Sequence, residues 1–286
     1  MRKLLRLYKA ERDDIADLVT YRVLPTTTGD TGQFEPFLFL NHHGPQIYPP
    51  GNRGLPFAPH PHRGFETLTF IRKGELMHRD SSGCASVIKA GGVQWMTAGS
   101  GIIHEEISSD VFKKVGGEVE ILQLWINLPA ALKFTKPNYV GMQRADIKMQ
   151  DLPDGQGNVQ IISGQWLSEK ANYQSLTGVD AAALELKAHA DLKIPVNADR
   201  RIFVYVVQGQ VAVNSHDLQD HNLGEFEVGE GGLEIHAQSN ACIFLATAKP
   251  LGEPIVSHGP FVMNTKAEIH EAIFDYQAGK FGSWNH

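Results

Sequence analysis

Apolar and polar residues follow one another along most of the chain in short runs, a pattern that predicts β-strands. The runs are rich in β-branched and aromatic residues, and clear examples lie at residues 67–71, 120–126 and 201–207. Glycine and proline, with 28 and 15 copies, separate the runs from one another. Many short strands joined by turns are typical of an all-β protein.

Helical periodicity becomes clear near the C-terminus. Thr265 and Glu268 have the spacing of a capping box, with Thr265 as the N-cap residue. Apolar residues then recur at helical spacing between positions 269 and 276, and Gly279 offers a stop. We therefore expect a short C-terminal helix over residues 266–278.

The two halves of the chain resemble each other. Residues 70–75 match residues 205–210 at an offset of 135, and each half continues as strand, glycine turn and strand. A repeat of this kind predicts a duplicated all-β domain.

Composition and charge narrow the class of protein. The 286 residues include 42% hydrophobic and 20% charged residues, which favours a soluble, packed core. The net charge of −6, without a long basic run, argues against direct nucleic-acid binding. No signal peptide or membrane-spanning stretch is evident, so we expect a cytoplasmic protein. Cys84 and Cys242 lie far apart outside any CxxC spacing and are expected to be free thiols.

Two pairs of residues have the spacing of metal ligands. His60 and His62 are two positions apart, and alternation along a strand would place both imidazoles on one face. His104 and Glu106 repeat the spacing. These four residues predict a site for one divalent metal ion, which suits iron and also manganese, nickel, copper or zinc.

The identity of the carboxylate ligand is open at this point. Glu66 follows the first histidine pair and is an alternative to Glu106. Two carboxylates beside three histidines would leave little room for a substrate. A contrasting interpretation is that Pro61 and the neighbouring glycines hold these residues in a surface loop.

The repeat predicts that the second half lacks a metal site. The offset of 135 places Pro195 and Asn197 at the positions of His60 and His62. A looser match, at an offset of 133, places Ala237 and Ser239 opposite His104 and Glu106. His236 is nearby but stands alone.

Other side chains have two interpretations each. His42 and His43 either line an entrance to the metal site or belong to a solvated turn. Trp95 and Trp125 either fill a barrel interior, which we favour, or line an aromatic cavity. His78 is interpreted as a structural or surface residue.

The segments that carry the predicted ligands resemble the two cupin motifs. The first motif, G-x5-H-x-H-x3-E-x7-G, runs from Gly54 to Gly74, and the second runs from Gly91 to Glu106. The chain resembles the pirin family of bicupins in detail. The segments that carry this likeness are HPHRGFET, VQWMTAGSGIIHEE, LQLWINLP, FVMNT and DYQAG.

The resemblance implies two cupin-type β-barrels in one chain. The first, residues 1–140, would bind one metal ion, Fe(II) above all, and the second, residues 141–286, would bind none. The metal ligands of the family carry over to His60, His62, His104 and Glu106, which favours Glu106 and leaves Glu66 to orient a ligand. Residues 41–45 depart from the triplet common in pirins, which leaves the substrate preference open. The resemblance also favours a monomer.

The resemblance further implies quercetin 2,3-dioxygenase activity. A flavonol would react with dioxygen in an oxygenative ring cleavage that releases carbon monoxide, with Glu106 accepting the proton of the flavonol hydroxyl. The alternative is a regulatory pirin that acts as a transcription cofactor or metabolic-enzyme partner through protein contacts. A third hypothesis is a cupin isomerase or another metal-dependent oxygenase. An enzyme predicts an open aromatic pocket at the metal, whereas a regulatory protein predicts a closed site.

Overall fold

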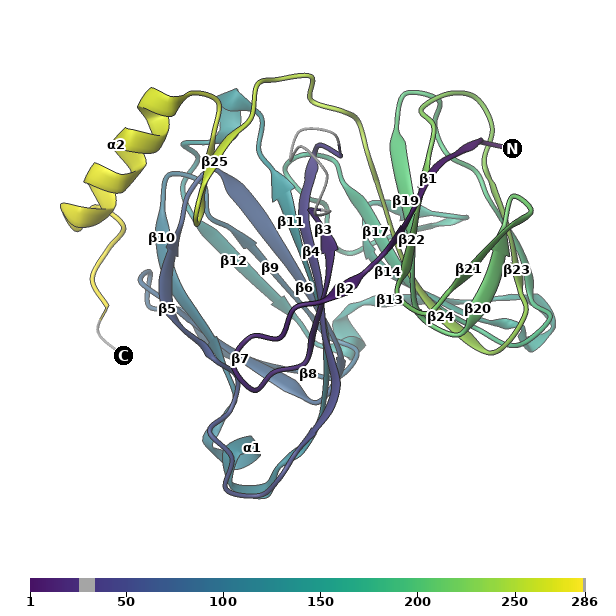
Figure 1. Ribbon diagram of the computed structural model, residues 1–286, viewed down its shortest axis with the longest axis horizontal. Coiled ribbons are helices and arrows are strands. Elements are labelled where there is room, and N and C mark those ends of the chain that lie inside the picture. The colour runs from purple at the N-terminus through teal and green to yellow at the C-terminus, as the bar shows by residue number, and fades with distance from the viewer. Residues whose placement is uncertain (26–33, 285–286) are drawn as a thin grey trace. The chain divides into compact units, whose positions relative to one another are not determined.

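Short strands dominate the structure, as the alternating apolar runs predict (Figure 1). The computed structural model describes residues 1–25 and 34–284. They fall into two units, and we call residues 12–144 with 251–286 the first barrel and residues 1–11 with 145–250 the second barrel.

The first barrel is built from a seven-stranded and a four-stranded antiparallel sheet. The larger sheet has the order β12 (Asn138–Met142), β9 (Val93–Thr97), β6 (Phe65–Lys73), β11 (Gly117–Asn127), β4 (Phe37–Tyr48), β3 (Thr20–Leu24) and β2 (Glu11–Arg12). The smaller sheet has the order β5 (Phe57–His62), β10 (Ile102–Ile107), β7 (Glu75–Asp80) and β8 (Ala85–Lys89).

The second barrel repeats this arrangement. Its larger sheet has the order β1 (Leu4–Lys9), β22 (Asn222–Phe226), β19 (Arg201–Gln208), β24 (Ala241–Ala248), β17 (Asp180–Leu186), β14 (Gly157–Ser163) and β13 (Lys148–Asp151). Its smaller sheet has the order β18 (Asp191–Ile194), β23 (Leu233–Ala237), β20 (Gln210–Val213) and β21 (His216–Gln219).

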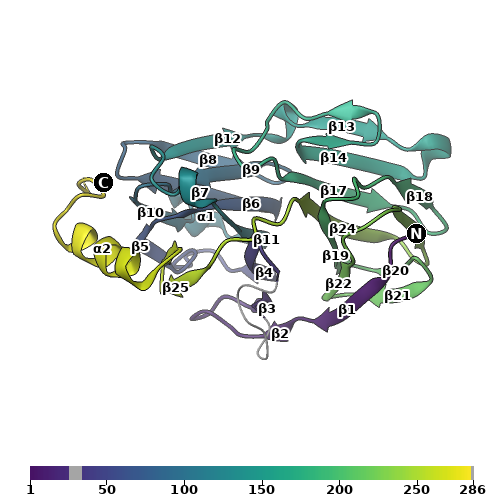
Figure 2. The same ribbon diagram turned by 90° about the horizontal axis from the view of Figure 1, so that it is seen from above.

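Two hairpins and a few helical turns complete the chain. The hairpins are β15 (Gln165–Trp166) with β16 (Glu169–Lys170) and β25 (Val256–His258) with β26 (Phe261–Met263). The helical segments are α1 (Asp110–Val115), α2 (Lys266–Gln277) and the 3₁₀ turns Ala130–Leu132, Arg144–Asp146 and Pro153–Gly155. In both views α2 lies beside β5 and β10 of the first barrel (Figures 1 and 2).

The C-terminal helix has the predicted cap. The Thr265 side chain accepts a hydrogen bond from the backbone N–H of Glu268, and the Glu268 carboxylate accepts one from the backbone of Thr265. This reciprocal pair satisfies two donors that the first helical turn leaves free. The helix ends at Gln277, one residue before the predicted end.

Equivalent glycines confirm the internal repeat. Gly74 joins β6 to β7 and Gly209 joins β19 to β20, with φ values of +80° and +94°. A Cβ atom on either residue would lie 2.3 Å from a backbone carbonyl oxygen, of Glu118 or of Asn240. Glycine is therefore required at both turns, which explains why this part of the repeat is visible in the sequence.

The second-barrel residues equivalent to the metal ligands differ from those that the constant sequence offset predicted. Pro195 and Asn197 are exposed and follow the end of β18. The inward-facing residues of β18 and β23 are apolar and belong to the core of the second barrel: Ile194, Leu233, Ile235 and Ala237, with Leu192 packed against them. A fixed offset fails here because the loop before β19 is longer than the loop before β6.

The N-terminal and C-terminal segments do not belong to the units in which the predicted boundary, after residue 140, would place them. Near the middle, the boundary between residues 144 and 145 lies close to the predicted one at 140. However, β1 pairs with β22 in the second barrel, and residues 251–286 belong to the first barrel. The terminal segments are assigned to the two barrels by pairing between strands distant in sequence, which the local sequence pattern does not predict.

Candidate metal centre

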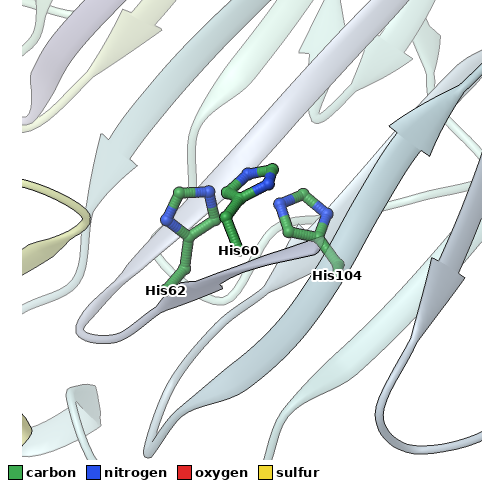
Figure 3. Close-up of side chains that lie close together, drawn as sticks. All are labelled: His60, His62 and His104. Carbon is green, nitrogen blue, oxygen red and sulfur yellow. The ribbon is translucent and has the colours of Figure 1, made fainter. Parts of the chain in front are cut away.

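Three imidazole side chains converge inside the first barrel (Figure 3). His60 and His62 extend from β5, and His104 extends from the neighbouring strand β10, where it pairs directly with His60. One ring nitrogen of each residue lies within 4.8 Å of the others. The predicted clustering of these histidines is therefore present, and the surface-loop interpretation is wrong, because the residues lie in paired strands.

Backbone carbonyls fix the orientation of the two β5 histidines. Nδ1 of His60 lies 2.7 Å from the carbonyl oxygen of Ala58, and Nδ1 of His62 lies 3.3 Å from that of Pro260. A carbonyl oxygen accepts a hydrogen bond and cannot donate one, so Nδ1 carries the hydrogen in both rings. The lone pair is then on Nε2, which leaves that nitrogen as the metal ligand.

His104 has no such partner. Its side chain is 1% exposed, and neither ring nitrogen has a hydrogen-bond partner among the described residues. Burial and the neighbouring imidazoles hold the pKa values of His62 and His104 well below the ordinary histidine range. Neutral imidazoles with free lone pairs are the form that binds a divalent metal, so the cluster fits such an ion.

Glu106 lies beside this cluster, although it is not one of the three residues that converge. Its carboxylate accepts hydrogen bonds from Thr69 Oγ1, at 3.2 Å, and from Gln123 Nε2. The pairing of β10 with β5 is irregular between His104 and Glu106. Glu106, on β10 of the smaller sheet, thus extends toward the larger sheet, where Thr69 on β6 and Gln123 on β11 hold its carboxylate.

Glu66 occupies the other face of strand β6. It accepts a hydrogen bond from Thr97 Oγ1 at 2.7 Å and is completely buried. Strand alternation gives Glu66 the opposite orientation to Thr67 and Thr69, and Thr69 contacts Glu106. This geometry favours Glu106 as the carboxylate nearer to the histidines.

A row of polar side chains faces Glu106 from the larger sheet. Gln94, Thr69, Gln123 and Asn41 are direct neighbours across β9, β6, β11 and β4. Directly opposed residues share a face of a sheet. Sequence reasoning missed this row. The available signal was a glutamine within an apolar run, Gln94 in β9 and Gln123 in β11.

Aromatic side chains adjoin the row on the same face. The Trp125 ring lies 4.4 Å from Phe65, 4.7 Å from Phe39 and 5.1 Å from His62 between centroids. Trp125 and Phe39 are partly exposed, so they do not merely fill the core. An aromatic surface therefore borders the histidine cluster.

The remaining histidines of this region are buried. His42 pairs with Glu120, and His43 contacts Thr20 Oγ1 at 2.9 Å, so the solvated-turn interpretation is wrong. His78 pairs with Asp80 at 2.9 Å and its ring lies 5.5 Å from that of His104. His78 is therefore a neighbour of the cluster, which its sequence context did not indicate.

Two barrels of facing sheets in one chain, with a histidine cluster inside the first, define a bicupin protein. The chain belongs to the pirin family: the family model described as Pirin matches residues 18–126, and the model described as Pirin C-terminal cupin domain matches residues 181–282. This confirms the resemblance found in the sequence motifs.

Individual relatives match over almost the whole chain. A Pseudomonas aeruginosa protein named as a putative quercetin 2,3-dioxygenase is 35% identical over 282 residues, which covers 98% of this chain and 99% of the relative. A pirin-like protein of Caulobacter vibrioides is 35% identical over 285 residues with the same coverage. The crystal structure of a quercetin 2,3-dioxygenase from Acinetobacter baumannii has a TM-score of 0.92 at 34% identity and covers 99% of both chains.

Proposed function

We propose that this pirin is a metal-dependent dioxygenase that cleaves flavonols such as quercetin. The observation that carries the proposal is the convergence of His60, His62 and His104 beside an aromatic surface. The names of the similar Pseudomonas and Acinetobacter proteins support the same activity. In the part of the chain that the structure describes, no helix has the length and apolarity needed to cross a membrane.

His60 and His62 would hold the ion through Nε2 and His104 through one of its two ring nitrogens, with Glu106 as the fourth ligand. Fe(II) is the proposed metal, because three imidazoles with one carboxylate leave positions open for dioxygen and a substrate oxygen. The bound metal would lower the pKa of the flavonol hydroxyl and orient the substrate toward dioxygen.

The protein side chains would position the flavonol and accept its proton. Trp125 and Phe39 offer a surface for the flat rings, and aromatic pairs of this kind favour stacked or edge contacts. Glu106 would accept the hydroxyl proton, and Gln123 would hold the carboxylate in place through its hydrogen bond.

Metal analysis and turnover on the same samples test the proposal. The purified chain is loaded with Fe(II), its iron content is measured, and quercetin absorbance is followed in air. We expect loss of the flavonol band with the wild-type protein and not with His62→Ala. The control is His236→Ala, which removes an exposed histidine of the second barrel that pairs with Asp191. Absence of quercetin turnover at full iron occupancy would overturn the proposed dioxygenase activity.

A regulatory role without turnover is the second candidate. The near-complete burial of His62 and His104 favours this role, because a closed site would not admit a substrate. A bound metal would then act only through its effect on the surface that a protein partner contacts. Iron occupancy with no loss of quercetin would then be the expected result of the same experiment.

A further inference from the structure

A pocket of about 420 Å³ opens on the second barrel, within the unit that lacks the histidine cluster. Its walls come from the β15–β16 hairpin, the start of β17, the segment after β18 and the end of β24. This volume lies in the range of small-molecule sites, about 300–1,000 Å³. Polar side chains predominate in the lining, with three amide side chains from Gln165, Gln174 and Asn197.

Arg200 is the fixed element of this pocket. Its Nη2 donates hydrogen bonds to the backbone carbonyls of Gly178, at 2.7 Å, and Thr247, at 2.6 Å, and lies 3.2 Å from Asp180 Oδ2. The side chain is 11% exposed, and Nη1 has no hydrogen-bond partner among the described residues. The guanidinium is therefore held in one orientation with one nitrogen left for a ligand, which lowers the entropy cost of binding.

The charges around Arg200 select an anion with a single charge. Lys170 lines the same pocket, is exposed, and forms no ion pair within the described ranges. Asp180 offsets one of the two cations, so the pocket keeps about one net positive charge. A carboxylate matches that charge, whereas a phosphate group at neutral pH carries about −1.5 to −2.

Apolar side chains flank the charged wall. Leu167 and Val196 are partly buried against the core of the second barrel and also line the pocket. We propose that the pocket binds a small organic carboxylate, whose anionic group contacts Arg200 and Lys170 while its apolar body lies against Leu167 and Val196. This site is independent of the metal centre and of the proposed dioxygenase activity.

Titration of the isotope-labelled full chain with benzoate and, separately, with inorganic phosphate tests this site at constant ionic strength. We expect benzoate to cause saturable shifts in the backbone amide resonances of Gln165, Leu167 and Asn197. Phosphate should bind about tenfold more weakly or not at all. The absence of saturable benzoate shifts, or equal affinity for the two anions, would overturn the proposal.

Three variants connect the binding to the named side chains. Lys170→Gln should weaken benzoate binding about two- to fivefold, as an exposed charge does. Lys187→Gln removes the same charge from an exposed position outside the pocket and should leave binding unchanged. Arg200→Gln should weaken binding about tenfold or more, with thermal unfolding as a check on its fold. Equal losses in Lys170→Gln and Lys187→Gln would refute a local site.

Discussion

Nδ1 of His62 lies 3.3 Å from the backbone carbonyl oxygen of Pro260, a residue 198 positions further along the chain. The same C-terminal segment contributes Asp275, whose carboxylate accepts a hydrogen bond from Arg63 Nη2 at 2.9 Å. One end of strand β5 is thus held by residues that follow the second barrel in sequence. The orientation of a predicted metal ligand depends on this distant segment.

Replacement of Asp275 by Asn should lower both stability and metal affinity. The change removes the charged partner of Arg63, which is 4% exposed, and should reduce the free energy of unfolding by about 1–3 kcal/mol. Metal affinity should fall about tenfold, because the strand that carries His62 is less firmly held. Urea unfolding and a metal titration measure the two effects. Asp110→Asn, at an exposed position of α1, is the control and should change neither.

The stability effect of Asp275 should depend on pH. Hydrogen bonds from Lys280 and Arg63 hold the pKa of the Asp275 carboxyl below its ordinary value. A carboxyl with a lowered folded-state pKa stabilises the protein above its unfolded-state pKa, about 3.9, and this contribution is lost as pH falls through the folded value. The difference between wild type and Asp275→Asn should therefore shrink below about pH 4. A difference that stays constant down to pH 3 would contradict this account.

His104→Leu should separate stability from metal binding. The variant removes two buried nitrogens that have no partner in the described ranges, so the metal-free protein should become about 1–3 kcal/mol more stable. It should also lose the rise in melting temperature that metal causes in the wild type. Thermal unfolding with and without Fe(II) gives both results.

The matched control for His104 is His78→Leu. His78 is equally buried, at 1% exposure, but its Nε2 is paired with Asp80. Its replacement should destabilise the metal-free protein because it leaves the Asp80 carboxylate without this partner. If both variants shifted the melting temperature in the same direction, the missing partners of His104 would not be the cause.

Gly64→Ala should disrupt the link between β5 and the C-terminal segment. Gly64 has φ of +89°, and a Cβ atom there would lie 2.0 Å from the carbonyl oxygen of Val262. Gly83 has the same φ of +89° but open space around its Cβ position. Gly83→Ala should therefore show the cost of the backbone conformation alone, about 1–2 kcal/mol. Gly64→Ala should lose clearly more, and equal losses in chemical denaturation would contradict the predicted clash.

Lys133 should make stability rise with pH in the alkaline range. Its ammonium donates to the carbonyls of Gly64 and Val262 and to Asn127 Oδ1, and burial lowers the pKa of Lys133 to about 8. Because the unfolded chain keeps the proton up to about pH 10.4, the folded state is favoured increasingly as pH rises from 8 toward that value. The advantage of wild type over Lys133→Met in urea unfolding should grow over this interval. If the stability advantage of wild type fell over this pH interval, the lowered pKa of Lys133 would be contradicted.

Many features of the fold and the site could be predicted from local periodicity in the sequence. Alternation placed His60 with His62 on one face, and the spacing of Thr265 and Glu268 located the cap of α2, because these relationships involve residues a few positions apart. The all-β class and the repeat followed from strand runs and from glycines required at equivalent turns. The free state of Cys84 and Cys242 also agrees with their spacing.

The sequence by itself thus determined the strand class, the duplicated design and the three histidines that converge. Tertiary structure decided which terminal segments complete each barrel, that Pro260 orients His62, and that Gln123 and Thr69 hold Glu106. The physical reason is that sheet register and loop length bring these residues together across long sequence separations. A difference in the length of one loop changes which residues of the two barrels are equivalent, while the local pattern of each strand stays the same. For this reason Pro195 and Asn197 are not the structural equivalents of His60 and His62.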